Sequence, residues 1–405
     1  MNKSKIINDP VYGFITIPGN LVYELIEHPY FQRLRRIKQL GMSEYVYPGA
    51  IHSRFHHALG AMHLMMEAVK ILRQKGVKIT DREAEGLYCG ILLHDIGHGP
   101  YSHSLEHTLI RKVPHEHISL MLMEKLNIEF KGKLDLAIKI FNGKYERGFF
   151  HQLISGQLDM DRLDYLGRDS FFTGVTEGVV GSERIINMLN VVDDELVVEE
   201  KGIYSIEKFI IARRLMYWQV YLHKTVVASD LLLTNVMKRA TELANEGRNL
   251  FATPALEFFL EQNVTAQMFR DDPKVLQRFV QLDDSDILSA IKSWQHADDK
   301  VLSLLSRNLV NRRLPKVLIS NKPYSDRELR EKQDHVSNLF QLKRGESVYF
   351  ASMNILKNDA YQVEKGNIRI LMKNGEVLDV TEASDNYNLK ALRQTVKKYY
   401  LSFYR

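Results

Sequence analysis

The chain has 405 residues, of which 45% are hydrophobic and 26% charged, the composition of an ordinary soluble globular protein with material for one or two domains. Its formal net charge of +5 suits anionic ligands but is too small to indicate nucleic acid, which stays open as a partner. A single cysteine, Cys89, excludes an intramolecular disulfide and favours a reducing compartment. Without a signal peptide or an apolar run of about eighteen residues, we expect a cytoplasmic protein with no membrane partner.

The predicted elements are mostly helices. A short strand is expected over 14–17, and helical periodicity begins at Leu21 and ends at Gly41. Further helices are predicted from Ser53 to about Gly76 and then over 81–95, 103–111, 115–126, 132–142, about 206–245 and several parts of 254–340. The sequence therefore predicts a mainly α fold in which one helix packs on the next.

The C-terminal part of the chain has a different pattern. Residues 347–351 and 367–372 have the composition and spacing of strands, and 373–376 form a hairpin turn between strands. A final helix is predicted over 388–404. The apolar side chains of these strands indicate a small packed α/β unit.

The chemistry of the chain concentrates around His94 and Asp95, which follow an apolar run. Glycines and a proline come next, so the helix should end there and leave the pair at its last turn. A neutral imidazole and a carboxylate suit a borderline-to-hard divalent metal, whereas a surface His-Asp contact is the simpler alternative. Ten of the fifteen histidines lie in one region, interspersed with apolar residues as in a lined pocket: His52, His56, His57, His63, His94, His98, His103, His107, His115 and His117.

A second cluster, from Leu158 to Asp169, holds four carboxylates. Asp161, Tyr165 and Asp169 are spaced four residues apart and share one helical face. The interleaved apolar residues indicate a largely buried helix, and buried acids need a partner or a metal. A solvated acidic helix would also explain the cluster, but we favour at least one of these acids as a metal ligand.

Two basic segments could bind anions. Four basic residues lie between Arg33 and Lys38, where a solvated basic face is the simpler interpretation. Further along, Arg213, Tyr217 and Tyr221 share one helical face, and Arg213 with Tyr221 could hold a phosphate and a sugar or base. Tyrosines packed at a helix crossing are the alternative.

Together these residues resemble the HD-domain superfamily of metal-dependent phosphohydrolases, whose pattern is a histidine, a His-Asp pair and a distal aspartate. His57, His94, Asp95 and Asp161 meet this pattern. The longer motifs resemble the deoxynucleoside triphosphate triphosphohydrolases, in the branch whose vertebrate member carries a sterile-alpha-motif domain, which we expect to be absent here. The segments that carry the resemblance are 9–13, 31–41, 47–50, 54–60, 94–103, 161–169, 221–224, 367–372 and 392–394.

The resemblance implies an HD-type helical catalytic domain over 1–345, with its metal core at about 50–170, and the α/β appendage over 346–405. It implies hydrolysis of a deoxynucleoside triphosphate (dNTP) to deoxynucleoside and inorganic triphosphate. One divalent metal ion is implied, for which Mg, Mn, Fe, Zn and Co all stay open, and a nucleotide-bound Mg is a further option. The implied ligands are His57, His94, Asp95 and Asp161.

The resemblance also implies roles in catalysis. His115 is our choice of general acid for the leaving 5′-oxygen, oriented by Glu116 or Glu106. His98 and His103 would surround the scissile α-phosphate ester together with His115. A metal-bound or metal-polarised water, or hydroxide, would attack the α-phosphorus.

The implied substrate residues divide into a phosphate set and a sugar set. The phosphates would contact Arg54, Arg162, Tyr165 and Arg213. Arg162 stands where the vertebrate enzyme has a lysine, which keeps the charge but changes reach and hydrogen-bond geometry. Gln39 and Asp169 would bind the sugar 3′-hydroxyl, while Leu40 and Tyr221 would pack against C2′ and exclude a ribose 2′-hydroxyl.

In this family, activating nucleotides bind between subunits, which gives the basic segment a second explanation. Glu27 replaces an aspartate expected to contact a guanine edge, which lengthens that carboxylate side chain. The resemblance implies a nucleotide activator and a homo-oligomer, either a tetramer or a dimer. The matching positions are Lys5, Asn8, Glu27, Gln32, Arg35, Arg184, His223 and Lys224.

Two other functions are compatible with parts of the sequence. An HD-type phosphohydrolase or phosphodiesterase could act on another nucleotide, but Leu40, Tyr221 and the phosphate-binding arginines argue against this. A non-catalytic protein that senses nucleotides or binds nucleic acid would not need the complete metal ligand set. We therefore favour dNTP hydrolysis.

Overall fold

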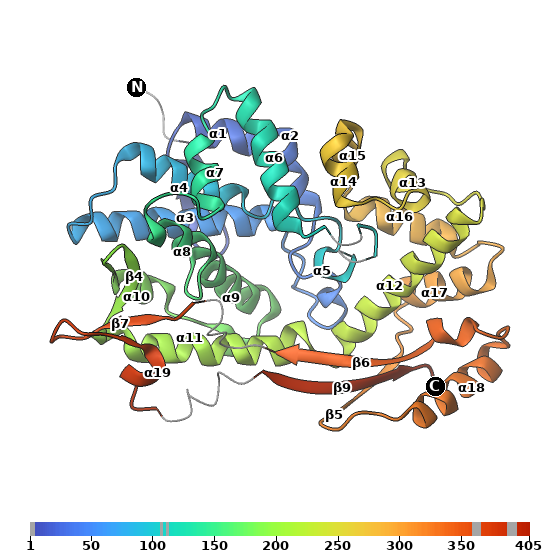
Figure 1. Cartoon of the computed structure of the whole chain (residues 1–405). Helices are drawn as coiled ribbons and strands as arrows, with labels where there is room; N and C mark the ends of the chain where they lie inside the picture. The colour runs from blue at the N-terminus through green and yellow to red at the C-terminus, as the bar shows by residue number, and fades with distance from the viewer. Residues whose placement is uncertain (1–4, 106–107, 111–112, 359–365, 387–394) are drawn as a thin grey trace.

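The computed structural model describes residues 5–105, 108–110, 113–358, 366–386 and 395–405, with only the backbone of Ser102 and His103 (Figure 1). Its fold is mainly helical with small sheets, which confirms the predicted fold class. Among the described residues, no helix is both long and apolar enough to cross a lipid bilayer.

Helices dominate the half of the molecule that carries the predicted metal ligands. The first helices are α1 (Asn20–Glu27), α2 (Pro29–Gln32), α3 (Arg54–Gln74), α4 (Asp81–Leu93), α5 (Ser102–Leu105), α6 (His115–Glu129), α7 (Asp135–Phe141), α8 (Gly148–Ser155) and α9 (Met160–Thr173). The later helices are α10 (Ser182–Asn187), α11 (Ile203–Met216), α12 (Lys224–Asn245), α13 (Pro254–Glu261), α14 (Ala266–Asp271), α15 (Pro273–Phe279), α16 (Asp284–Trp294), α17 (Lys300–Val310), α18 (Asp326–Phe340) and α19 (Val380–Ala383).

Helix α3 lies at the centre of the metal-bearing region and packs on both α4 and α9. It is buried on most sides, as its apolar residues and the small residues Ala58, Gly60 and Ala61 allow. A capping box of Ser53 and His56 begins α3, and a second one of Thr80 and Glu83 begins α4. The three helices thus bring distant parts of the sequence to one buried centre.

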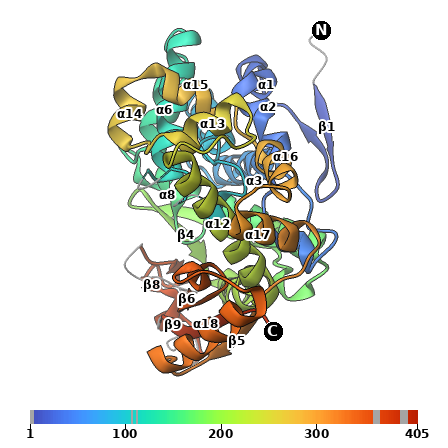
Figure 2. The ribbon, with the colours of Figure 1, turned by 90° about the vertical axis from the view of Figure 1, so that its right-hand side faces the viewer.

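Among the described residues, the strands form three antiparallel or mixed sheets. The strands are β1 (Ile6–Asp9), β2 (Gly13–Thr16), β3 (Leu189–Val192), β4 (Glu195–Glu199), β5 (Lys316–Ser320), β6 (Ala351–Asn358), β7 (Arg369–Leu371), β8 (Val377–Asp379) and β9 (Val396–Phe403). Strands β1 and β2 form a hairpin, β4 runs parallel to β7 in the order β3-β4-β7-β8, and β9 lies between β5 and β6. Figure 2 shows the β5-β9-β6 sheet and α18 at the opposite end of the molecule from α1 and α6.

The final helix predicted over 388–404 is wrong for the described part of that range. Residues 396–403 form β9, which pairs with β5 on one side and β6 on the other. Its last four residues are all buried, so the strand has no alternation by which to recognise it. The turn at 373–376 does join two antiparallel strands, β7 and β8, as predicted.

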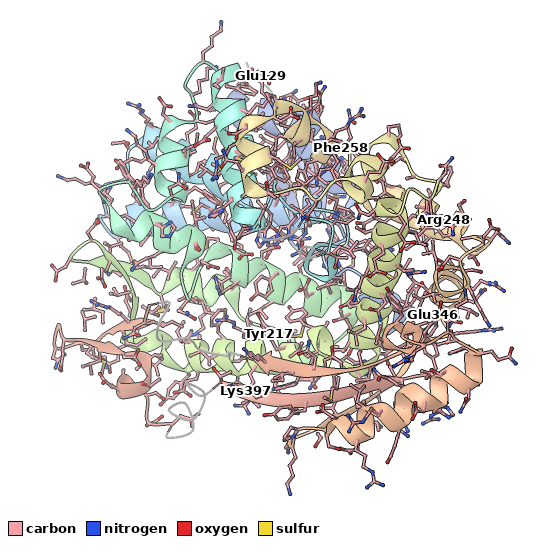
Figure 3. All side chains as sticks on the ribbon, turned by 45° about the vertical axis from the view of Figure 1, so that its right-hand side comes forward. Glu129, Tyr217, Arg248, Phe258, Glu346 and Lys397 are labelled. Atoms are coloured by element: carbon pink, nitrogen blue, oxygen red, sulfur yellow. The ribbon has the colours of Figure 1, made fainter. Side chains whose placement is uncertain are left out.

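Two predicted long helices are interrupted. The segment from Leu21 to Gly41 breaks at His28 before Pro29 and ends in a 3-10 helix over Arg33–Arg36. Helix 206–245 breaks at a π-helical turn, Tyr217–Tyr221, which lies between α11 and α12. Figure 3 shows Tyr217 near Lys397 of β9, and the next residue along each segment, Trp218 and Lys398, form a cation–π contact of 4.0 Å.

Smaller boundary differences occur elsewhere. A 3-10 helix over Glu346–Tyr349 replaces the first part of the strand predicted over 347–351. Strand β5 was not predicted. Because β5 joins the sheet of β6 and β9, strands from both sides of residue 345 share one sheet, and the division into domains at that point stays a prediction.

Candidate metal centre and active site

Three helices place four potential metal ligands around one point. Helix α3 carries His57, the end of α4 carries His94 and Asp95, and the first turn of α9 carries Asp161. His57 Nε2 lies 3.3 Å from His94 Nε2 and 3.1 Å from Asp161 Oδ1. Asp95 Oδ1 lies 3.3 Å from His94 Nε2. The structure therefore brings all four predicted ligands together.

Both imidazoles are oriented by a hydrogen bond on the opposite ring nitrogen. His57 Nδ1 lies 2.7 Å from Asp164 Oδ2, and His94 Nδ1 lies 2.6 Å from the carbonyl oxygen of Ile91. A carboxylate and a carbonyl can only accept, so each Nδ1 donates and Nε2 is the nitrogen left to bind either a proton or a metal ion. The two Nε2 atoms face the same place, as in proteins that bind metal through histidine.

The electrostatics of the four groups favour a cation at their centre. Burial would lower the pKa of His57, but hydrogen bonds with Asp161 and Asp164 outweigh it and raise the pKa to about 10. Burial also opposes ionisation of Asp161, yet the hydrogen bonds with His57 and His94 hold the pKa of that carboxyl far below its usual range. A donor set of two imidazoles and two carboxylates fits a divalent metal ion that takes the place of the proton.

His98 and His115 form a stacked pair beside the metal ligands. Their ring centroids lie 3.7 Å apart with 20° between the ring planes, and His98 Nε2 lies 3.2 Å from Asp95 Oδ1. Burial, and then the charge of Arg54, holds the pKa of His98 well below its usual range. Arg54 itself is buried and donates to Asp95 Oδ2 over 2.5 Å. Asp95, His98 and His115 form a second group whose ligand-type atoms lie within 4.8 Å of one another.

Three of the four predicted sugar-binding residues, Gln39, Asp169 and Tyr221, are linked by contacts with His52 and with one another. Tyr221 donates its hydroxyl hydrogen to Asp169 Oδ2 over 2.7 Å, and Asp169 Oδ1 lies 2.8 Å from His52 Nε2. The backbone N–H of Gln39 donates to the carbonyl of His52 over 3.0 Å, and Leu40 packs half-buried on the core. Gln39 Oε1 is buried and has no hydrogen-bond partner among the described residues. Sequence reasoning gave His52 no role, although it belongs to the histidine-rich region.

Two of the predicted phosphate-binding residues, Arg162 and Arg213, lie close to the buried carboxylate of Asp159. Asp159 Oδ1 accepts the backbone N–H of Arg162, and Asp159 Oδ2 contacts the Arg162 guanidinium. Burial raises the pKa of Asp159 to about 6, against the charges of Arg162 and, more weakly, Arg213. Arg213 donates to Gln157 Oε1 over 3.1 Å, and the Tyr165 ring lies edge-on to Tyr221 at 6.3 Å. The phosphate set and the sugar set are therefore continuous.

Sequence reasoning missed two charged residues behind the metal centre. Asp164 accepts from His57, and Arg168 Nε donates to Asp164 Oδ2 over 3.0 Å. Both side chains are fully buried. Their spacing of four residues on α9 is a signal that could have identified the pair, because such residues are neighbours on a helix.

Not every predicted site residue can be placed. The side chain of His103 and all of Glu106 lie outside the described residues. Glu116 is exposed, with Oε1 at 3.5 Å from His115 Nε2.

The predicted activator residues lie in separate parts of the chain. Lys5 Nζ lies 3.1 Å above the Tyr23 ring, and Arg35 Nε donates to Gln32 Oε1 over 2.8 Å. Arg184, on α10, donates to Ser205 Oγ over 3.2 Å. The other predicted residues lie at the end of α1 (Glu27), in β1 (Asn8) and at the start of α12 (His223 and Lys224). A nucleotide site made by these residues stays a prediction.

Fold and site together define a helical protein of the HD type, and comparisons with known proteins agree. The family model of the HD domain matches residues 54–167, and that of the HD associated region matches 180–252. A solved structure of a phosphohydrolase from Bacteroides thetaiotaomicron is 53% identical, with a TM-score of 0.96 and 100% of both chains covered.

Two relatives extend the comparison. The protein YwfO of Bacillus subtilis is 31% identical over 403 residues, covering 95% of this chain and 88% of that protein. The deoxynucleoside triphosphate triphosphohydrolase SAMHD1 homolog of Dictyostelium discoideum is 28% identical over 78% of this chain and 60% of its own length. The chain belongs to the HD-domain phosphohydrolases.

Proposed function

We propose that the protein hydrolyses dNTPs to deoxynucleoside and inorganic triphosphate. The observation that carries this proposal is the contact between Tyr221 and Asp169, two helical turns along α9 from the metal ligand Asp161. A sugar held at Asp169 would lie on the same helix face as the metal centre. The ring of Tyr221 would then close the space that a ribose 2′-hydroxyl needs. The name of the Dictyostelium relative supports the same substrate class.

The charges beside the proposed metal ligands and sugar-binding residues suit a triphosphate. Arg54, Arg162 and Arg213 supply three guanidinium groups, and all three are at least four-fifths buried. Guanidinium groups bind phosphate oxygens through paired N–H donors, and a buried position strengthens the attraction. Gln39 Oε1 has no hydrogen-bond donor among the described residues, so it would accept the hydrogen of the sugar 3′-hydroxyl.

The residues beside the metal ligands can move the proton that the reaction requires. A divalent ion held by His57, His94, Asp95 and Asp161 would activate a water and neutralise charge on the α-phosphate. The water oxygen would join the α-phosphorus as the bond to O5′ breaks, and His115 would give its proton to O5′ while the proton of the water leaves with the triphosphate or passes to solvent. His115 stacks on His98, whose Nε2 lies 3.2 Å from Asp95 Oδ1, so the proposed acid lies beside the proposed metal ligands. Mg²⁺ prefers oxygen ligands, so a second, nucleotide-bound Mg would be held by phosphate oxygens rather than by His98 and His115.

The test is product analysis with metal-supplemented protein and a panel of dNTPs and ribonucleoside triphosphates (rNTPs). Triphosphate and deoxynucleoside should appear with dNTPs, and rNTPs should react at least tenfold more slowly. Tyr221→Ala should reduce this discrimination, because the wall against the 2′-hydroxyl is gone. Tyr221→Phe is the matched control, since it removes only the hydrogen bond to Asp169 and keeps the wall. Equal rates for dNTPs and rNTPs in the unaltered protein would reject the proposal in favour of another nucleotide substrate.

We also infer that a nucleotide activates the protein by binding between its copies. The support is the match of these residues to the family's activator positions, which fall in two parts of the sequence: the β1 and α2 region carries one set, and α10 and the start of α12 carry the other. Two partial sets from different copies can complete one site that neither has alone. An anionic nucleotide would offset repulsion between basic side chains at such a contact.

A further inference from the structure

A chain of buried charges leads from the metal ligand His57 to the N-terminal hairpin. Asp164 Oδ2 lies 2.7 Å from His57 Nδ1, and Arg168 donates to both Asp164 oxygens over 3.0 Å. Arg168 Nη1 also donates to Asp9 Oδ2 over 2.8 Å. Asp9 is the last residue of β1, so this chain joins the hairpin to the ligand through three charged side chains.

The hairpin contacts the buried charges through Asp9 and Tyr12. Asp9 Oδ1 accepts the backbone N–H groups of Val11 and Tyr12 over 2.9 Å and 3.0 Å, and a longer bond from Arg168 Nη2 over 3.3 Å. Oδ1 therefore forms the turn, while Oδ2 makes the shorter bond to Arg168. The Tyr12 ring lies 5.5 Å from the Arg168 guanidinium. Asp9 is only 4% exposed, and His57, Asp164 and Arg168 are 0% exposed. Water therefore cannot replace these contacts if one is removed.

We propose that Asp9 is a positioning residue for the metal centre and acts on His57 through Arg168 and Asp164. It does not touch the metal or the substrate. The N-terminal hairpin and the metal site then stabilise each other across this chain of contacts. The inference rests on the proposed metal site and extends it to a part of the chain that carries none of its ligands.

The physical reason is the sharing of one cation between two carboxylates. With Asp9 in place, the charge of Arg168 is divided between Asp9 and Asp164. Without the charge of Asp9, Asp164 alone neutralises Arg168. Arg168 then draws the electron density of the Asp164 carboxylate away from its hydrogen bond with His57 Nδ1. A weaker acceptor at Nδ1 makes the imidazole a poorer ligand and holds its ring less firmly.

The first experiment measures metal affinity in the full chain. Protein stripped with a chelator is titrated with Mn²⁺ by calorimetry, for the unaltered chain and for Asp9→Asn. Asparagine keeps an oxygen for the turn but cannot accept from Arg168 at the second position. We expect Mn²⁺ affinity to fall about 10-fold to 100-fold, the usual effect of losing an outer partner of a metal ligand. Unchanged affinity in a folded Asp9→Asn protein would overturn the proposal.

Asp299→Asn is the matched control. Asp299 Oδ1 accepts the backbone N–H of Leu302, and Asp299 Oδ2 accepts from Arg239 Nη2 over 2.6 Å, so it makes the same two kinds of contact as Asp9. It lies at the start of α17, away from the metal ligands. Asp299→Asn should keep the Mn²⁺ affinity of the unaltered chain. Asp9→Glu, which retains the charge, should recover part of the affinity lost in Asp9→Asn.

The second experiment uses the unaltered chain and so does not depend on folding of a variant. If the hairpin and the metal site stabilise each other, metal must protect the hairpin as much as the hairpin favours metal. Amide hydrogen exchange at Val11 and Tyr12 should slow at least threefold when Mn²⁺ is bound. Exchange that is indifferent to Mn²⁺ would overturn the proposal. Failure of the unaltered chain to bind Mn²⁺ or any other divalent ion would instead reject the metal site itself.

Discussion

At Asp161, a partly exposed carboxylate completes a group of ligands that is otherwise buried. Its side chain is 28% exposed, whereas His57 is fully buried and His94 nearly so. Asp161 therefore contributes little packing, and its oxygen at 3.1 Å from His57 Nε2 is its main contact. A ligand of this kind can be removed without opening a large cavity.

Asp161→Ala should lose bound metal and keep its fold. Two imidazoles and one carboxylate remain, which leaves a divalent ion with weaker binding and less charge neutralisation. Elemental analysis of purified protein measures the metal content, and circular dichroism measures the fold. Asp135→Ala, at the start of α7, is a control that should retain metal. A full metal complement in Asp161→Ala would exclude this aspartate as a ligand.

Gly60 makes room for the ion pair behind His57. A Cβ atom at this position would lie 2.0 Å from Asp164 Oδ1 and 2.2 Å from Arg168 Nη2. Neither group can retreat, because both are buried and held by further contacts. The close approach of α3 to α9 thus requires glycine here.

Gly60→Ala should destabilise the protein by about 1–3 kcal/mol or more, because overpacking displaces the buried pair. Gly167→Ala is the matched control on α9, where an added Cβ meets nothing within 4 Å. That change should stabilise by about 0.5–1 kcal/mol, since alanine favours helix over glycine. Denaturant unfolding of both variants gives the comparison. Equal effects at the two positions would show that space around Gly60 is not limiting.

At the scale of elements, the basic segment after α2, from Arg33 to Lys38, holds distant parts of the chain together. A solvated face was the simpler interpretation of its charge, and for Arg33 this is wrong: the side chain is only 1% exposed. Arg33 donates to the carbonyl of Leu282 over 2.8 Å and to that of His98 over 2.6 Å. Arg36 pairs with Asp283 at 2.5 Å. The 254–340 region, in which the sequence shows no motif, therefore supports the segment that carries His98.

Asp284, at the start of α16, joins the same elements. Its two oxygens accept the backbone N–H groups of Lys38 and Tyr101 over 2.9 Å and 2.8 Å. Burial raises the pKa of Asp284 to about 6, although these two hydrogen bonds oppose the shift. The folded protein therefore keeps a proton between about pH 4 and pH 6 that the unfolded chain has lost.

The consequence is a pH-dependent contribution to stability. It is fully present below the pKa of the unfolded chain, near 4, and is lost as pH rises through about 6. The variant Asp284→Asn does not titrate at this position. The stability of the unaltered protein relative to Asp284→Asn should therefore be about 2–3 kcal/mol greater at pH 4 than at pH 7. Denaturant unfolding of both proteins at the two pH values measures this difference. A difference that is constant with pH would contradict the raised pKa.

At the scale of the whole molecule, the proposed activation depends on contacts between copies. Arg35 is exposed, and its guanidinium lies 3.6 Å from the Phe55 ring while it donates to Gln32. Arg35 can therefore contact a nucleotide or another copy while its guanidinium stays against the Phe55 ring. The residues His223 and Lys224 lie far from it in sequence, at the start of α12.

Arg35→Ala should weaken nucleotide-driven assembly and activation at least tenfold while leaving metal content unchanged. A nucleotide that binds only the assembled form favours assembly, and the lost cation weakens that binding. Light scattering with and without GTP or dGTP, beside the activity assay, is the measurement. Arg327→Ala, an exposed arginine on α18, is the control. A mass and rate of the unaltered protein that do not respond to any nucleotide would rule out this regulation.

The sequence by itself determined the helical class, and its resemblance to the HD-domain superfamily identified the ligands that meet in space. Helical spacing places Asp161 and Asp169 on one face wherever α9 packs, and the His94-Asp95 pair ends its helix because glycines and a proline follow. These features depend on local chain geometry, so they survive without knowledge of the fold. The hairpin at 373–376 is predictable for the same reason.

Only the tertiary structure decided which distant residues meet. Strand β9 is set by its two neighbours, because its last four residues are all buried and show no periodicity that separates strand from helix. The inward turn of Arg33 and the pairing of Asp9 with Arg168 depend on acceptors far away in the sequence. Burial makes such polar contacts obligatory but does not specify the partner, so their positions follow from packing of the whole chain.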